Sequence, residues 1–174
     1  GLVDLEFLLQ YLVLRDAAEQ PALLSVASLS SSQANERAQR IRSDWTALAD
    51  AVGSRAVDGP QSFARHTALI AQQLDLLEDV TDVSGMTLDP VSETYFMIQA
   101  ALSYLPQLTE SLGQARAQGA LVLARGEASP EQRARLAALN NLSRMHRRNA
   151  QKDMENVFAA APHLQQTLQA PVAS

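Results

Sequence analysis

Apolar residues recur at steps of three and four along most of this chain, which is the spacing of one face of an α-helix. The clearest case is a seam in which the steps alternate between four and three, formed by Phe63, Thr67, Ile70, Leu74, Leu77 and Thr81. Such a seam is typical of helices that pack side by side. Ala and Leu, the best helix formers, number 29 and 26 of 174 residues, against 7 Gly and 7 Pro. The sequence therefore predicts an all-α protein.

Turn residues divide this pattern into five helical stretches. They are expected over 3–29, from the serine turn at 30–32 to 52, and over 60–83, 90–125 and 130–161, with a short periodic tail after Pro162. Ser129 and Gln132 have the spacing of a capping box, and Asp89-Pro90 is typical of an N-cap followed by a first-turn proline. Pro21 and Pro106 are each expected to kink or break a helix. Short links make neighbouring helices antiparallel, so we expect an elongated up-and-down bundle of four to six helices, forming a single domain over 1–174.

Composition excludes several classes of function. The chain has no cysteine, which excludes disulfides, thiol nucleophiles and cysteine-ligated metals. A net charge of −5 and a pI near 5.1 argue against nucleic-acid binding. No apolar run approaches the roughly 20 residues that cross a bilayer. The three histidines are scattered and no catalytic, metal or cofactor motif is present, so we expect neither an enzyme nor a metal or cofactor site.

Two arginines interrupt seams that are otherwise apolar. Arg116 falls in phase with the seam of the fourth stretch, which is formed by Tyr95, Ile98, Leu102, Leu105, Thr109 and Leu112. Arg15 falls in phase with Leu5, Leu8 and Leu12. A buried cation costs several kcal/mol unless it is paired. Each arginine therefore either reaches solvent or an ion-pair partner, or binds an anionic ligand.

Further polar residues accompany these arginines. Tyr95 and Tyr104 can add hydroxyl donors to such a ligand site, whereas Asp89 is assigned to capping. In the last stretch His146, Asn149 and Asp153 fall at positions where the packed face of the helix should be apolar. They either line a polar pocket or mark a drift in the phase of the helix.

The middle of the chain carries a series of short motifs that resembles a known group of domains. The motifs are Ser84-Gly85-Met86-Thr87-Leu88-Asp89-Pro90, Thr94-Tyr95-Phe96-Met97, Leu105-Pro106, and Leu112-Gly113 followed by Arg116. This series resembles the helical extracytoplasmic sensor regions of bacterial transmembrane receptors. Those regions precede the output modules of methyl-accepting chemotaxis proteins, sensor histidine kinases of two-component systems, and diguanylate cyclases.

The resemblance implies a non-enzymatic sensing domain in the periplasm, excised from a membrane-anchored inner-membrane receptor and forming a homodimer. A small anionic or polar ligand is expected between the first and fourth helices, near Arg15 or Arg116, and binding would be transmitted as a rearrangement of helices. The alternative is a structural or partner-binding helical bundle without a small-molecule ligand.

Overall fold

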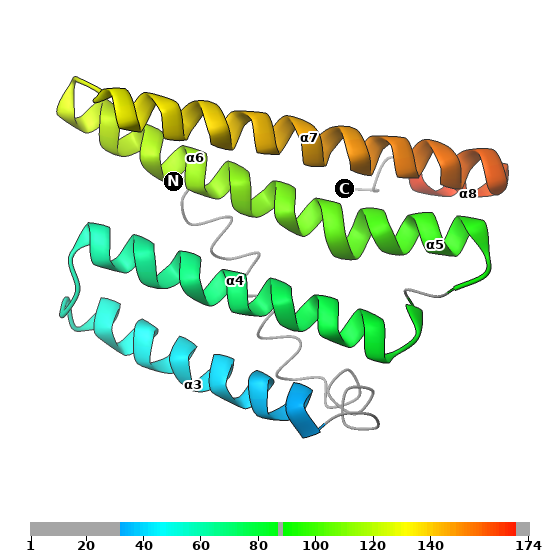
Figure 1. The fold of residues 1–174 in the computed structure, drawn as a ribbon, viewed down its shortest axis with the longest axis horizontal. Helices are drawn as coiled ribbons and strands as arrows, with labels where there is room; N and C mark the ends of the chain where they lie inside the picture. The colour runs from blue at the N-terminus through cyan, green and yellow to red at the C-terminus, as the bar shows by residue number, and fades with distance from the viewer. Residues whose placement is uncertain (1–31, 87–88, 170–174) are drawn as a thin grey trace. The chain divides into compact units, whose positions relative to one another are not determined.

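The computed structural model describes residues 32–86 and 89–169, and every regular element in these two ranges is helical (Figure 1). In chain order the elements are α3 (Ser32–Gly53), α4 (Gly59–Val83), α5 (Ser92–Ile98), the π-helix η2 (Gln99–Tyr104), α6 (Leu105–Arg125), α7 (Pro130–Ala160) and α8 (Pro162–Gln169). The all-α helical-bundle prediction is confirmed. The helix expected over 3–29, with Pro21 and Arg15, lies outside the described residues.

The chain divides into two compact units, Gly1–Ser84 and Gly85–Ser174. In the first unit α3 and α4 form an antiparallel hairpin (Figure 1). Its core contains three buried aliphatic residues, with Trp45 and Leu76 packed against them: Ile41, Leu48 and Leu69. In the sequence Ile41, Trp45, Leu48 and Val52 follow one another at steps of four, three and four, which predicts one packed helix face, and the first three do lie on it. The prediction is wrong at Val52, which is 43% exposed near the end of the helix.

Local hydrogen bonds set the turn between α3 and α4. The Asp58 carboxylate accepts from the backbone N–H of Gln61 at 2.7 Å, and the Gln61 side chain accepts in return from the Asp58 N–H. This capping box fixes the start of α4. At the other side of the turn Arg55 adopts a left-handed φ of 58°, and the N–H of Ala56 reaches back to the carbonyl of Ala51 at 2.8 Å. The chain thus leaves α3 through a left-handed residue that is not glycine.

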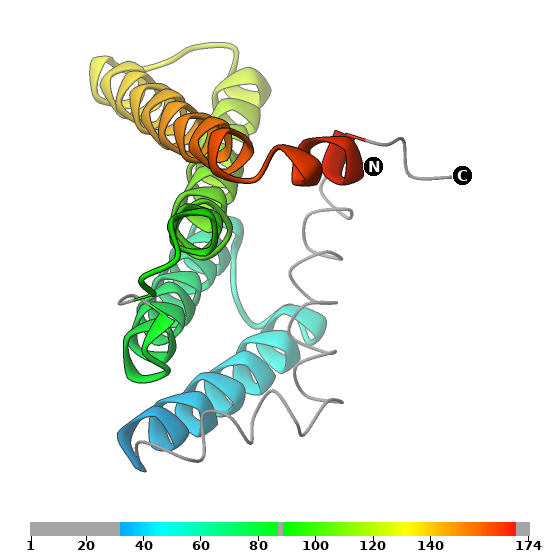
Figure 2. The same ribbon diagram turned by 90° about the vertical axis from the view of Figure 1, so that its right-hand side faces the viewer.

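In the second unit α5, η2 and α6 follow one another without a break and pack against α7 (Figure 1). Gly126, at a φ of 76°, ends α6 as predicted, and the predicted capping box of Ser129 and Gln132 starts α7. The chain turns between α7 and the short α8 (Figure 2), which begins at Pro162.

Helix α5 begins later than the sequence predicts. Its N-cap is Val91, not Asp89. The Asp89 carboxylate instead accepts the N–H of Val91 at 2.8 Å, which is the local turn that aspartate commonly makes before a helix. The assignment of Asp89 as N-cap is therefore wrong by two residues, although its side chain does order the approach to the helix.

The seam predicted for the fourth stretch is wrong as a packed face. Tyr95, Leu105 and Leu112 are 37%, 46% and 48% exposed. The buried positions of this helical stretch are instead Ala100, at 0%, and Ser111, at 6%. Small side chains let α6 and α7 approach closely, and the π-helix changes the phase of the apolar pattern partway along. Beyond this point, at Leu105 and Leu112, a seam extrapolated at α-helical spacing therefore lies on the wrong face, whereas Tyr95 precedes the π-helix.

Pro106 explains why the π-helix lies where it does. Proline has no N–H and its ring clashes with the carbonyl four residues before it, so an α-helical bond from position 106 is unavailable. The chain widens instead, and the N–H of Leu105 bonds to the carbonyl of Ala100, five residues back. The expected disturbance at Pro106 thus takes the form of a wider turn within a continuous helix.

Candidate functional site

The predicted ligand residues that the structure describes all lie on one continuous helical stretch. Tyr95 lies in α5, Tyr104 ends η2, and Arg116 lies in α6. At 1.5 Å of rise per residue, Arg116 is roughly 18 Å along the axis from Tyr104 and roughly 30 Å from Tyr95. One small anion within one chain therefore cannot contact Arg116 together with either tyrosine. Arg15 lies outside the described residues.

Arg116 and Tyr104 are buried to a similar degree, whereas Tyr95 is more exposed. Arg116 is half-buried, which gives its guanidinium a partly desolvated environment. Tyr104 is half-buried as well. The ring of Tyr95 meets that of Phe96 edge to face at a centroid distance of 5.4 Å, as aromatic pairs prefer. Arg116 thus has the environment in which a charge-assisted bond to an anion gains strength.

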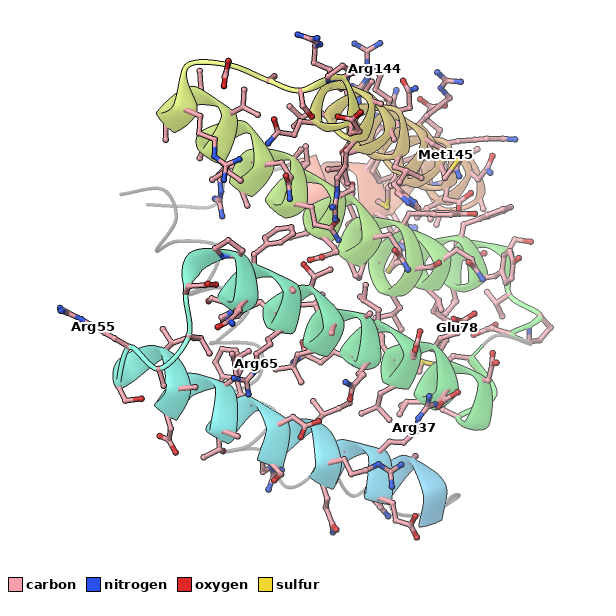
Figure 3. The ribbon with its side chains drawn as sticks, turned by 60° about the vertical axis from the view of Figure 1, so that its left-hand side comes forward. Arg37, Arg55, Arg65, Glu78, Arg144 and Met145 are labelled. Carbon is pink, nitrogen blue, oxygen red and sulfur yellow. The ribbon has the colours of Figure 1, made fainter. Side chains whose placement is uncertain are left out.

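Two other arginines already have carboxylate partners. Arg37 of α3 forms an ion pair with Asp79 of α4, near the end of the hairpin shown in Figure 3. Arg40 lies 3.8 Å from Glu36 on the exposed side of α3. Exposed pairs of this kind contribute about 0–1 kcal/mol to stability.

The packed face of α7 carries polar groups where it meets α6. The hydroxyl of Ser143 donates to the hydroxyl of Ser111 at 2.9 Å, across the two helices. Both serines are 6% exposed. One turn further along α7, the Nδ1 atom of His146 is buried and has no hydrogen-bond partner. These residues make the α6–α7 contact an interface of small and polar side chains.

Asp153 continues this polar face toward the end of α7. Burial raises the pKa of its carboxyl group, while the charge of the neighbouring Lys152 lowers it. The sequence had placed His146, Asn149 and Asp153 on the packed face, and the structure shows all three half-buried there. It had not identified Ser111 and Ser143. Ser143 lies four residues after Leu139 and seven before Ala150, on the same buried face of α7.

A shallow hollow of about 510 Å³ lies along α3 and is open to solvent. Within the described ranges its lining residues are exposed and, apart from Ala47, of polar type, and they include Arg42, Thr46 and Asp50. The guanidinium and the carboxylate have opposite charges, so the hollow as a whole does not favour an anion. Arg55, in the turn after α3, and Arg144, on α7, are both labelled in Figure 3, where their side chains extend away from the ribbon.

The residues that the structure describes contain no group of three acidic or histidine side chains that could hold a metal ion. Over the same residues, no helix has the length and apolarity needed to cross a bilayer.

Comparison with known proteins adds one finding. A family model described as "Nitrate and nitrite sensing" matches residues 9–174. No curated protein matches, and no solved structure does. The family match covers the whole described part of the chain, including both helical units.

Proposed function

This chain belongs to the nitrate and nitrite sensing family, and from that premise we propose that it is the periplasmic sensing domain of a bacterial inner-membrane signalling receptor. The ligand is nitrate or nitrite. The family match over residues 9–174 is the observation that carries the proposal. It agrees with the small anionic ligand expected from the arginines in the sequence. A domain of this kind has no catalytic step and acts by binding alone.

The chemistry of the ligand favours arginine as its partner. Nitrate is planar, carries one negative charge and accepts hydrogen bonds at its oxygens. A guanidinium is also planar, stays charged at all physiological pH values and presents a fork of N–H donors. Arg116 is the described residue that combines such a fork with partial burial in the second unit. We assign the anion to Arg116, with Arg15 of the first predicted helix as the alternative.

Binding transmits a signal only if the anion has different affinities for two arrangements of the helices. Residues 1–174 then act as one domain, paired with a second copy in the receptor. In a dimer Tyr95 or Tyr104 can approach the Arg116 of the other copy, although the three are separated along one chain. The output module converts the change in helix arrangement into a response.

Isothermal titration calorimetry with sodium nitrate and sodium nitrite tests the proposal. We expect binding to the unmodified chain, weakened at least about tenfold in Arg116→Gln or, for the alternative site, in Arg15→Gln, since a charge-assisted hydrogen bond contributes about 1.5–3 kcal/mol. Arg147→Gln is the matched control, because Arg147 is an exposed arginine of α7. It should bind as the unmodified chain does.

Absence of binding heat for both anions would contradict the proposal and favour a bundle that senses through a partner protein. Equal weakening by Arg147→Gln would show a general effect of charge and remove Arg116 from the site.

A further inference from the structure

The interface between α6 and α7 contains a hydrogen-bonded pair of serines and, one helical turn further along α7, a buried imidazole nitrogen that has no hydrogen-bond partner. Ser143 of α7 is bonded to Ser111 of α6 at 2.9 Å. His146, three residues further along α7, has its Nδ1 buried without a partner. A buried polar atom without a hydrogen bond costs about 1–3 kcal/mol. The present alignment of the two helices therefore carries the free-energy cost of an unpaired buried nitrogen, and an alignment that gives this nitrogen a donor removes that cost.

We propose that α7 has a second register against α6, in which His146 takes the place of Ser143 opposite Ser111. The change is a slide of three residues, which is roughly 4.5 Å along the axis, with a rotation of roughly 60°. In the second register the Ser111 hydroxyl donates to Nδ1 of a neutral imidazole that carries its proton on Nε2. This inference rests on the proposed function, since the anion is what shifts the balance between registers.

Neither serine is left unsatisfied by the slide. The hydroxyl of Ser143 also lies 2.9 Å from the carbonyl of Leu139 in its own helix. That of Ser111 lies 2.9 Å from the carbonyl of Leu108. On leaving Ser111, Ser143 donates its single proton to the Leu139 carbonyl. The second register thus exchanges one bond between the helices for another, and it removes the unsatisfied nitrogen.

The same slide changes the surroundings of Asp153. The Ser111–Ser143 bond sets the antiparallel alignment, so Ala150 is now level with Tyr104, seven residues from each serine. In the second register Asp153 takes the level of Ala150 and comes opposite the turn that carries the Tyr104 hydroxyl. Burial raises the pKa of the Asp153 carboxyl in the present register. A hydroxyl donor at that level would stabilise the charged form.

The packing at the contact permits the movement. Four of its buried side chains are small: Ala100, Ser111, Ser143 and Ala150. The two larger buried residues of α7 are Leu139 and Val157, and a slide of three residues brings Leu142 and Ala160 to their levels. Shifts of one packed helix by a turn against another are a known form of switching. Both registers are discrete because each needs Ser111 to meet a polar group of α7.

Disulfide trapping tests the two registers, and the chain has no cysteine of its own to interfere. The Ser111–Ser143 bond places Ala115 level with Leu139, four residues from each serine, so Ala115→Cys with Leu139→Cys reports the present register. Ala115→Cys with Leu142→Cys reports the second, and both pairs leave Ser111, Ser143 and His146 in place. The matched control is Ala115→Cys with Asn141→Cys, since Asn141 is exposed beside Leu142. We expect both reporter pairs to cross-link faster than the control in the full chain without added anion. Sodium nitrate should change the ratio of the two rates about tenfold, within the usual range of coupling between sites.

A second variant keeps the test independent of the introduced thiols. His146→Leu removes the unsatisfied nitrogen and the partner that Ser111 needs in the second register. It should raise the melting temperature of the free chain and change its affinity for nitrate about tenfold, whereas Arg147→Leu should leave that affinity unchanged.

The outcomes separate this inference from the proposed function. If calorimetry shows that the unmodified chain binds nitrate, but the Ala115–Leu142 pair cross-links no faster than the control, the second register is overturned and the sensing function stands. If nitrate does not bind, the sensing function falls. Faster cross-linking of the Ala115–Leu142 pair than of the control would still support two registers.

Discussion

At the scale of single residues, Asp153 gives the chain a pH dependence with a defined sign. Burial raises its pKa in the folded state above the ordinary value of 3.8, so the folded protein binds this proton more tightly than the unfolded chain does. Stability therefore falls as pH rises between the unfolded and the folded pKa. Below that window the carboxyl is protonated in both states, and burying it carries no penalty for a charge. Above the window it is ionised in both states, and the full cost of desolvating the charge lowers the stability of the folded protein.

Asp153→Asn should accordingly raise the free energy of unfolding at pH 7, because the amide has no charge to desolvate. It should give no such gain at a pH below 3.8. Urea denaturation at the two pH values measures both, with Glu155→Gln as the control on the exposed side of α7. A gain of equal size at both pH values would show that packing, and not ionisation, is responsible.

At the scale of elements, the turn after α3 stores a small amount of strain in Arg55. A residue with a Cβ in the left-handed region costs about 1–2 kcal/mol relative to glycine. Arg55→Gly removes that cost but makes the unfolded chain more flexible, so we expect a net gain in stability of up to about 1 kcal/mol. Arg55→Ala keeps the Cβ and should be neutral. Thermal denaturation compares them, and a gain from alanine as large as that from glycine would rule out strain as the cause.

Elements also show what the sequence can predict. The capping box at Ser129 was predictable because both of its partners lie within four residues of each other. The end of α6 at Gly126 was predictable because glycine readily takes the left-handed conformation that ends a helix. The face of α3 followed from a period that nothing interrupts. The continuation of the seam to Leu105 and Leu112 was not predictable, because these residues follow the π-helix, where Pro106 widens the helix and alters the phase.

The candidate site was predictable only in part, for the same physical reason. Arg116 was found because a charge interrupts an apolar period. Ser111 and Ser143 were missed because small polar side chains are as common on helix surfaces as at close helix contacts, and only the contact itself distinguishes the two. Their hydrogen bond joins residues 32 positions apart, a separation over which local sequence rules give no information.

At the scale of the whole molecule, the two compact units should respond separately to damage in one core. Leu48 is 2% exposed at the centre of the α3–α4 hairpin, and Leu48→Ala should cost about 2–5 kcal/mol. Hydrogen exchange should accelerate within 32–84 and remain unchanged within 92–160. Leu123→Ala, at a site 83% exposed, is the control and should change neither range. Equal acceleration in both ranges would show that the units unfold together.

The π-helix at Gln99–Tyr104 also bears on how relatives of this chain should be aligned. A π turn holds about one residue more than an α turn, so the helix can lose a residue here and close into regular α-helix without breaking the bond ladder on either side. The same loss within α7 would rotate every later side chain by roughly 100° and misplace its packed face. A length difference of one residue between otherwise similar sequences therefore belongs within positions 99–104, and aligning it elsewhere would pair residues that lie on different faces.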